Sequence, residues 1–254
     1  MALFGLIGYP LGHSFSKRYF TEKFEREKLD GYAYELFPLE SIALLPDLIN
    51  ENPSLHGLNV TIPYKTAVLP YLHGIHPEAA EIGAVNTIVI KNYRLYGFNT
   101  DVYGFASSLK KALDARVQPV SGALILGTGG ASKAVAFVLK KLEIPFSFVS
   151  RASKPGVLSY EELTENIVSS NELIINTTPL GMQPKIDDLP PIPFQYVGEK
   201  HLLYDLIYNP EQTAFMKNGM GKGAHVINGL EMLYLQADKA WQWWNEPEVE
   251  SFLR

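Results

Sequence analysis

A glycine-rich segment lies between a short apolar run and a helical stretch and has the composition of a phosphate-binding turn. Glycine lets the backbone turn tightly and approach a phosphate closely, and the free N–H groups at a helix start attract its negative charge. Ser132 replaces the third glycine of the G-x-G-x-x-G spacing. A tight turn without a ligand is the alternative. The predicted dinucleotide site comprises Gly127, Thr128, Gly129, Gly130, Ala131 and Ser132.

A polar segment follows the next predicted strand, where a dinucleotide fold places the residue that recognises the ribose, about 20 residues further on. Ser150, Arg151, Ser153 and Lys154 stand there, without Asp or Glu. Two cations and two hydroxyls suit a 2′-phosphate, because Arg offers a planar fork of donors to it. The segment therefore predicts NADP as cofactor, and a solvated polar turn is the alternative.

Four further polar segments lie in the first half of the chain, each at a predicted strand end or helix start. Ligands of open α/β sheets bind at this edge. The segments supply hydroxyls, carboxamides, two ammonium groups and one carboxylate, which fits a small polyol that carries a carboxylate. Ser14, Ser16, Asn86 and Asp101 taken singly are also typical of helix caps and turns. The segments are residues 12–17, 59–65, 83–87 and 99–101.

The elements that must position these residues alternate between strand and helix, which predicts a fold of the α/β class. Residues 85–90 and 94–98 are joined closely enough to form a hairpin with an antiparallel edge. We expect Asp101 to cap a helix that runs to residue 113, and residues 116–122 to form a linker. The region after Lys154 is short for a full crossover helix, and residues 184–193 predict a surface loop. The predicted strands are 3–8, 32–37, 55–60, 85–90, 94–98, 123–126, 146–149, 173–176, 202–206 and 224–227; the predicted helices are 16–27, 101–113, 132–142 and 230–244.

Composition restricts the functional classes. The 254 residues include no Cys, which excludes disulfides and thiolate chemistry and suits a reducing, cytoplasmic compartment. A net charge of -5 without a dense basic run argues against nucleic-acid binding, and no apolar segment approaches the roughly 20 residues that span a bilayer. His73 and His76 lie in a predicted turn without a carboxylate at ligand spacing, so we expect no metal site.

Eight segments in the same order resemble the shikimate dehydrogenase family, from Leu6 to about Gln236. The family resemblance implies a mixed α/β substrate domain of residues 1–101 plus 230–254, and a Rossmann-like, doubly wound NADP-binding domain of residues 102–229, with the active site in the cleft. We expect the tryptophans at 241, 243 and 244 to pack the last helix against the substrate domain, with one of them exposed. The matching segments are 8–16, 59–65, 83–87, 97–101, 127–132, 176–182, 204–210 and 228–233 with Gln236.

The resemblance also implies roles for single residues. Lys65 and Asp101 would be the catalytic pair, which agrees with ketone reduction, since hydride transfer leaves an oxygen that needs a proton donor. An exposed helix lysine is the alternative for Lys65. Gly229 would lie against the nicotinamide. The substrate would be bound by Ser14, Ser16, Asn59, Thr61, Asn86, Tyr208 and Gln236.

The predicted activity is the NADPH-dependent, reversible reduction of 3-dehydroshikimate to shikimate in aromatic amino-acid biosynthesis, by a monomer or homodimer without nucleic-acid or membrane partners. One alternative is a quinate/shikimate dehydrogenase of broader substrate range or NAD use, against which Arg151 argues. Another is a metabolite sensor without activity on the same fold. The presence of both Lys65 and Asp101 argues against the sensor.

Overall fold

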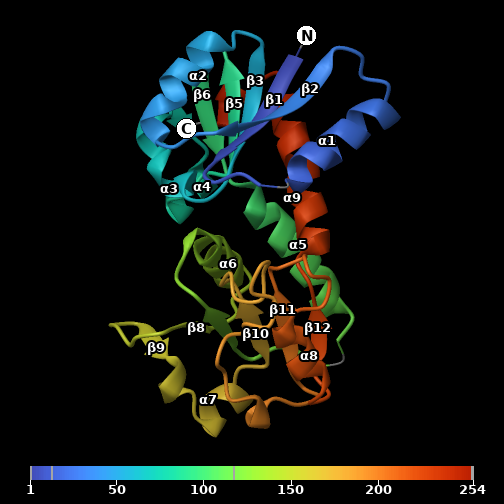
Figure 1. Ribbon diagram of the computed structural model, residues 1–254. Coiled ribbons are helices and arrows are strands. Elements are labelled where there is room, and N and C mark those ends of the chain that lie inside the picture. The colour runs from blue at the N-terminus through green and yellow to red at the C-terminus, as the bar shows by residue number, and fades with distance from the viewer. Residues whose placement is uncertain (1, 13, 117, 253–254) are drawn as a thin grey trace. The chain divides into compact units, whose positions relative to one another are not determined.

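The chain folds into two compact units in the computed structural model, which describes residues 2–12, 14–116 and 118–252 (Figure 1). The first unit comprises Met1–Thr100 and Ala237–Arg254, and the second comprises Asp101–Gln236. Each unit has its own sheet and apolar core. His13, in the first predicted polar segment, and position 117, in the predicted linker, lie outside the described residues.

The first unit is built on a mixed six-stranded sheet with the order β2-β1-β3-β5-β6-β4. β1 pairs in parallel with β2 and β3, whereas β5 runs antiparallel to β3 and β6. The elements are β1 (Ala2–Gly8), α1 (Phe15–Arg26), β2 (Tyr32–Pro38), η1 (Ile42–Leu44), α2 (Leu45–Glu51), β3 (Leu55–Val60), α3 (Tyr64–Ala67), η2 (Leu69–Tyr71), β4 (Gly74–Ile75), α4 (Pro77–Ile82), β5 (Thr87–Lys91) and β6 (Arg94–Phe98).

The β5–β6 hairpin confirms one prediction and corrects two details. Asn92 and Tyr93 form its two-residue loop, both with positive φ (51° and 60°), which matches the twist of paired strands. The predicted antiparallel edge is wrong, because β4 pairs in parallel with β6 and occupies that edge. The turn predicted between His73 and His76 is wrong for the same reason, since Gly74–Ile75 is this edge strand.

The second unit contains a six-stranded, entirely parallel sheet with the order β12-β11-β10-β7-β8-β9. Chain order runs outward from the central β7 in both directions, as in a doubly wound dinucleotide fold. Together with the mixed first sheet, this confirms the predicted fold class. The strands are β7 (Ala123–Leu126), β8 (Phe146–Ser150), β9 (Val157–Ser159), β10 (Leu173–Asn176), β11 (Leu202–Asp205) and β12 (His225–Ile227).

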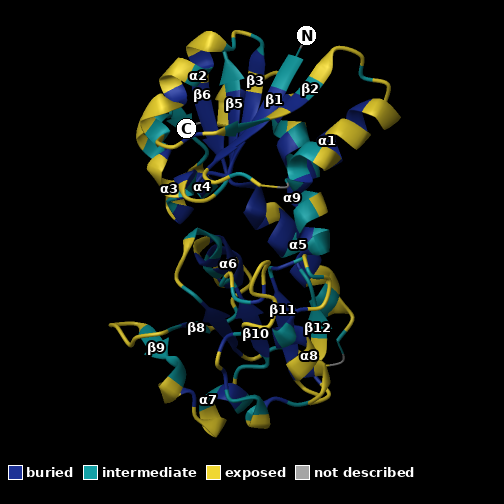
Figure 2. Cartoon of the chain, in the orientation of Figure 1, coloured by how far each residue is buried: buried dark blue, intermediate teal, exposed yellow. Residues whose placement is uncertain are grey.

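Figure 2 shows that the central strands of both sheets are buried, while many outer helical positions are exposed. β7 and β10 consist of residues that are all buried, which accounts for their continuous apolar runs. The connection from β8 to β10 has no long helix, as predicted. Residues 184–193 form the predicted loop, although Ile192 reaches the core.

Three helices begin earlier than predicted, α1 by a single residue. α5 starts at Thr100, so Asp101 lies in its first turn and the predicted capping role is wrong. α6 starts at Gly130, which places Ala131 and Ser132 inside the helix. Within the described residues, no helix combines the length and apolar character needed to cross a membrane. The remaining helices are α5 (Thr100–Asp114), α6 (Gly130–Lys141), η3 (Tyr160–Glu162), α7 (Glu165–Ser169), η4 (Phe194–Tyr196), α8 (Ala214–Met220), α9 (Leu230–Trp244) and η5 (Val249–Phe252).

The end of α9 packs its three tryptophans within the first unit. Trp244 is 8% exposed, lies 4.8 Å from the Phe4 ring and donates from Nε1 to the Ile88 carbonyl (3.0 Å). Trp241 contacts Phe4 edge-on, and Trp243 stacks on Phe98 at 4.2 Å. None of the three is exposed, so the prediction of one exposed tryptophan is wrong.

The Trp244 ring predicts a strict requirement for glycine at position 57. A Cβ added to Gly57 would lie 2.2 Å from Trp244 Nε1, and the buried, hydrogen-bonded indole cannot move away without breaking its contacts. We expect Gly57→Ala to lower the free energy of unfolding in urea by about 1–3 kcal/mol. Gly221→Ala, whose Cβ would meet its nearest atoms at 3.5 Å, is the matched control. Equal stability of the two variants would contradict this packing.

Candidate functional site

A buried, hydrogen-bonded set of polar side chains lies in the first sheet where β3 ends and β5 begins. The Asn86 Oδ1 atom accepts from the Thr100 N–H (2.7 Å), and Asn86 Nδ2 donates to Thr100 Oγ1 (3.0 Å). Asn59 Nδ2 donates to Thr87 Oγ1 (3.3 Å), and that hydroxyl donates to Asn86 Oδ1 (3.1 Å). All four residues are less than 10% exposed. This region therefore brings together the predicted residues Asn59 and Asn86, with their carboxamides already oriented.

Tyr34 of β2 completes this set and was not predicted as a site residue. Its hydroxyl donates to Asn59 Oδ1 (2.8 Å). Burial strongly raises the Tyr34 pKa, and a hydrogen bond with the Ser16 side chain offsets part of that rise. The phenol is therefore neutral and acts as a donor, connecting two residues predicted to bind substrate. Tyr34 lies in an apolar strand pattern, which gives no sign of a polar role.

Ser14 and Ser16 lie at the start of α1. Ser14 is the N-cap residue of α1, and its hydroxyl accepts from the Lys17 N–H at 3.4 Å. It therefore does act as a helix cap, the alternative to ligand binding that its sequence position allowed. Ser16 is partly buried in the first turn. Both residues therefore follow β1 at the edge where parallel strands end, which is compatible with ligand binding in addition to capping.

Lys65 and Thr61 lie in the segment that follows β3. Lys65 is in the short helix α3, partly buried, and its carbonyl accepts from the Val85 N–H at 2.7 Å. The Thr61 N–H donates to the Ile7 carbonyl (2.9 Å). The first of these backbone bonds fixes Lys65 to the chain just before Asn86, and the second fixes Thr61 to the end of β1.

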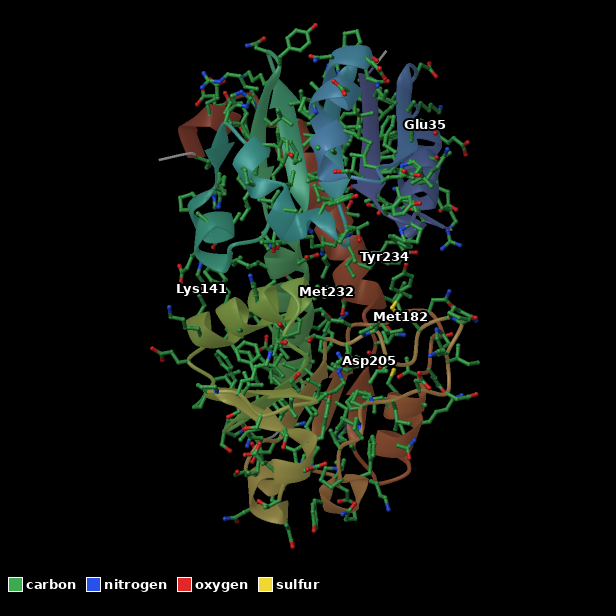
Figure 3. All side chains as sticks on the ribbon, turned by 60° about the vertical axis from the view of Figure 1, so that its left-hand side comes forward. Glu35, Lys141, Met182, Asp205, Met232 and Tyr234 are labelled. Carbon is green, nitrogen blue, oxygen red and sulfur yellow. The ribbon has the colours of Figure 1, made fainter. Side chains whose placement is uncertain are left out.

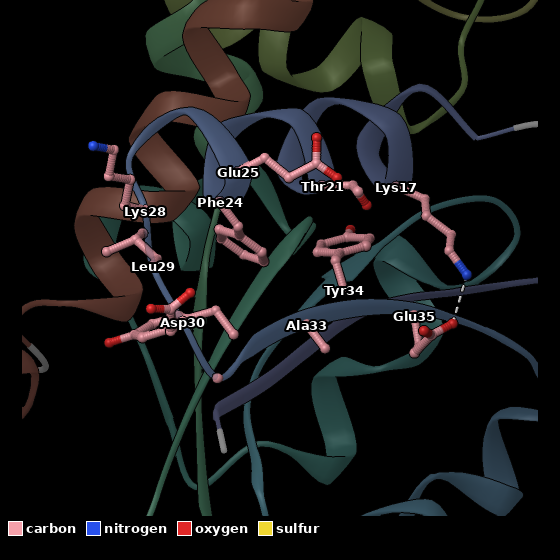
Figure 4. Close-up of a pocket in the computed structure, with 12 residues that line it drawn as sticks. Lys17, Thr21, Phe24, Glu25, Lys28, Leu29, Asp30, Ala33, Tyr34 and Glu35 are labelled. Atoms are coloured by element: carbon pink, nitrogen blue, oxygen red, sulfur yellow. Dashed lines mark hydrogen bonds and ion pairs between the residues drawn. The ribbon is translucent and has the colours of Figure 1, made fainter.

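A groove of about 700 Å³ lies elsewhere in this unit, between α1 and β2. Figure 4 shows the Lys17 ammonium reaching the Glu35 carboxylate at its end, with an N–O distance of 2.6 Å. The Tyr34 ring also lines it, but none of the predicted site residues does. The groove therefore does not coincide with the predicted substrate residues.

The glycine-rich turn of the second unit joins β7 to α6. Gly127 has φ +107°, a conformation that favours glycine, and a Cβ on Gly129 would meet no atom within 4 Å. No side chain caps the helix start at Gly129, which leaves first-turn N–H groups for an anion. The buried Ser132 hydroxyl donates to the Gly129 carbonyl (2.7 Å) and so holds the turn. The uncapped start and the open space fit a dinucleotide phosphate.

The predicted ribose-recognising segment follows β8. Ser150 is the last residue of β8, and Arg151, Ser153 and Lys154 are exposed. Lys154 and Val157 exchange backbone hydrogen bonds (3.1 and 2.8 Å), which turns the chain back toward β9. The two cations therefore project from a tight loop at the carboxyl edge of the sheet.

The buried carboxylate of Asp205, labelled in Figure 3, lies at the carboxyl end of β11 and anchors the loop that follows this strand. Its oxygens accept from Asn176 Nδ2 (3.0 Å), the Ile207 N–H (3.0 Å) and Thr213 Oγ1 (2.6 Å). Desolvation raises the pKa of Asp205 to about 6, although these three hydrogen bonds act in the opposite direction. Asp205 and Asn176 were recognised only as parts of sequence motifs. Their burial and pairing identify them as the support of the loop that carries Tyr208.

Four more predicted residues lie in the second unit. Asp101 is 8% exposed in the first turn of α5, and Tyr208 is partly buried in the loop after β11. Gln236 is 9% exposed and donates to the Leu233 carbonyl (3.0 Å). Gly229 packs so closely that a Cβ would lie 2.0 Å from the Leu206 carbonyl oxygen. No group of three or more metal-ligating side chains occurs within the described ranges.

Comparisons with known proteins identify relatives over the whole chain. Residues 6–88 match the model of the shikimate dehydrogenase substrate binding domain. A shikimate dehydrogenase (NADP(+)) of Clostridium beijerinckii is 39% identical, and the alignment covers 100% of this chain and 95% of the relative. This chain belongs to the shikimate dehydrogenase family.

Solved structures of family members have the same fold. Shikimate 5-dehydrogenase from Thermus thermophilus, in complex with NADP(H) and shikimate, is 31% identical with a TM-score of 0.84, covering 99% of this chain and 97% of that one. The Listeria monocytogenes shikimate 5-dehydrogenase in complex with shikimate and NAD is 26% identical with a TM-score of 0.82, covering 99% and 94%. The family thus includes structures with either nicotinamide cofactor.

The raised pKa of Asp205 predicts a pH-dependent stability. Its folded pKa of about 6 exceeds the unfolded value of 3.8, so the folded state binds the proton more tightly. This contribution is fully present below pH 3.8 and is lost as the pH rises through about 6. Between about pH 4 and 7 we expect the unfolding free energy of the wild type to fall, relative to Asp205→Asn, by up to about 3 kcal/mol. Asp187→Asn, an exposed change, serves as control in the same urea titrations. A pH-independent difference between wild type and Asp205→Asn would refute this role.

Proposed function

We propose that this chain catalyses the NADPH-dependent, reversible reduction of 3-dehydroshikimate to shikimate in aromatic amino-acid biosynthesis. The observation that carries the proposal is the family match over the full chain. The match to a relative whose structure holds NADP(H) and shikimate covers 97% of that relative's chain. The presence of Lys65 and Asp101 supports activity rather than ligand sensing. We further propose that the protein is cytoplasmic, acts as a monomer or homodimer and binds neither nucleic acid nor membranes.

The substrate is held by polar groups whose chemistry matches a carboxylated polyol. Ser14 and Ser16 donate hydroxyl hydrogen bonds to the carboxylate, with Tyr208 assisting. The ring hydroxyls are bound by Asn59, Thr61, Asn86 and Gln236. The bonds that Asn59 and Asn86 make to Tyr34 and Thr100 support these roles, because they fix the carboxamides before the substrate arrives.

Lys65 and Asp101 are the proposed catalytic residues. When bound, NADPH supplies the hydride, and the carbonyl oxygen of the substrate then requires a proton. The Lys65 ammonium attracts the developing negative charge and donates this proton. Asp101 orients the ammonium and accepts a hydrogen bond from the adjacent substrate hydroxyl. The backbone bond from Val85 N–H to the Lys65 carbonyl supports the role of Lys65 by fixing its segment.

NADP is held by the second unit. The uncapped start of α6 would hold its phosphates at Gly127, Thr128, Gly129, Gly130 and Ala131, and Ser132 supports the turn through its bond to the Gly129 carbonyl. Ser150, Arg151 and Lys154 would bind the 2′-phosphate, and Gly229 would bind the nicotinamide. The open space above Gly129 and the exposed cations support this placement. A site for a metal ion is not part of the proposal.

The activity is tested by following absorbance at about 340 nm, where the reduced nicotinamide absorbs, with shikimate or quinate and each nicotinamide cofactor. We expect shikimate with NADP to react fastest, and Lys65→Ala to lower kcat by about 10²- to 10⁴-fold with a much smaller effect on KM for shikimate. Lys110→Ala, an exposed lysine of α5, is the control. Retention of more than about a third of wild-type kcat would remove Lys65 from the mechanism. Faster turnover of quinate with NAD would favour the broader dehydrogenase.

The cofactor assignment predicts a selective effect of Arg151. A charged hydrogen bond is worth about 1.5–3 kcal/mol, so even one such contact gives NADP at least a roughly tenfold advantage in kcat/KM over NAD. Arg151→Ala should remove most of this advantage by raising KM for NADP, while KM for NAD stays nearly constant. Lys133→Ala, an exposed cation of α6, controls for net charge. An equal loss with both cofactors would show that Arg151 does not contact the 2′-phosphate.

A further inference from the structure

The β9–η3 segment brings an acidic residue to the edge that carries Arg151. β9 pairs in parallel with β8, and Ser159 lies opposite Ser150 in the register. Because parallel strands end at the same edge, the turn after β9 starts beside the loop after β8. Glu162 lies in that turn, η3, only three residues after Ser159. The loop of residues 151–154 after β8 has no acidic residue, but strand pairing brings one close from further along the chain.

The Glu162 side chain is held in a defined position. Its Oε2 atom accepts from the Ser159 N–H at 2.6 Å, as part of a capping box. The N–H and hydroxyl of Ser159 lower the pKa of Glu162, and the nearby Ser153 side chain adds a smaller effect in the same direction. The carboxylate is therefore ionised at neutral pH. A fixed negative charge is therefore present beside the loop of residues 150–154.

The loop of residues 150–154, which carries the proposed phosphate-binding residues, lies beside the segment of Glu162. Ser153 Oγ donates to the Val157 carbonyl at 3.5 Å, which ties the loop to the start of β9. Arg151 lies close enough to Tyr160, two residues before Glu162, to lower its pKa electrostatically, although burial is the larger influence and raises that pKa. The Arg151 cation, proposed to attract the 2′-phosphate, therefore lies close to the segment that carries the Glu162 carboxylate.

We propose that Glu162 is a specificity-determining residue that limits the preference of this enzyme for NADP over NAD. The inference rests on the proposed function, because it assumes that the 2′-phosphate binds at Ser150, Arg151 and Lys154. The carboxylate repels the nearly doubly charged phosphate and so weakens its binding. NAD carries a 2′-hydroxyl at this position and is nearly insensitive to the charge.

The substitution Glu162→Gln isolates the charge. Glutamine also accepts the N–H bond of a capping box, so η3 and β9 keep their structure. Alanine would remove the cap together with the charge and is unsuitable. Glu161→Gln is the matched control, because Glu161 is the exposed neighbour in the same turn and its substitution changes net charge equally.

The test measures binding to the full-length chain by titration calorimetry, with adenosine 2′,5′-bisphosphate and 5′-AMP as probes. These nucleotides differ only in the 2′-phosphate. We expect Glu162→Gln to bind the bisphosphate about three- to tenfold more tightly than wild type at low salt, with 5′-AMP affinity unchanged within about twofold. The gain should shrink at about 0.5 M salt. Glu161→Gln should change either affinity less than about twofold.

The outcomes separate the inference from the proposed function. If the wild type prefers the bisphosphate but Glu162→Gln behaves like Glu161→Gln, the role of Glu162 is overturned and the NADP assignment stands. If neither wild type nor Glu162→Gln prefers the bisphosphate, the NADP assignment fails and the inference fails with it. The kcat/KM ratio for NADP over NAD should rise in Glu162→Gln by the same factor as the affinity.

Discussion

The double hydrogen bond between the Asn86 carboxamide and Thr100 holds the candidate substrate edge together. It joins the chain entering β5 to the start of α5, two segments that are 14 residues apart. A buried carboxamide without partners would cost about 1–3 kcal/mol per unmet group, so the fold must satisfy it. Thr87, Asn59 and Tyr34 extend the set until its amide groups are paired. The geometry of the candidate site is therefore a condition of folding, established before any ligand binds.

The second unit depends on a different constraint, namely the parallel pairing of strands around β7. Parallel pairing brings the carboxyl ends of all its strands to one edge, and the residues proposed for NADP follow β7 and β8 there. The buried Asp205 carboxylate fixes the loop after β11 at the same edge. Burial of this carboxylate costs solvation free energy, as its raised pKa shows. The hydrogen bonds that it accepts fix the loop in return.

Local patterns in the sequence predicted the elements with continuous apolar runs or helical periodicity. The strands at 55–60, 123–126 and 173–176 and the helix at 230–244 have the predicted bounds. The edge strand β4 has two residues and the connection α7 has five, too few for a periodic signal. Tyr34 and Glu162 were missed for another reason. The proposed role of Tyr34 depends on a hydrogen bond to Asn59, 25 residues away, and that of Glu162 depends on the pairing of β9 with β8. No local sequence pattern contains either relation.

The placement of all three tryptophans on the end of α9 has a spectroscopic consequence. Positions 241, 243 and 244 belong to the first unit, and residues 101–236 contain no tryptophan. The Trp244 indole is buried against Phe4 and bonded to a strand carbonyl, so its emission will shift when that packing is lost. Tryptophan fluorescence, excited at a wavelength that tyrosine does not absorb, thus reports on the first unit alone, whereas far-ultraviolet circular dichroism reports on both. Comparing the two signals during denaturation separates the unfolding of one unit from that of the other within the native chain.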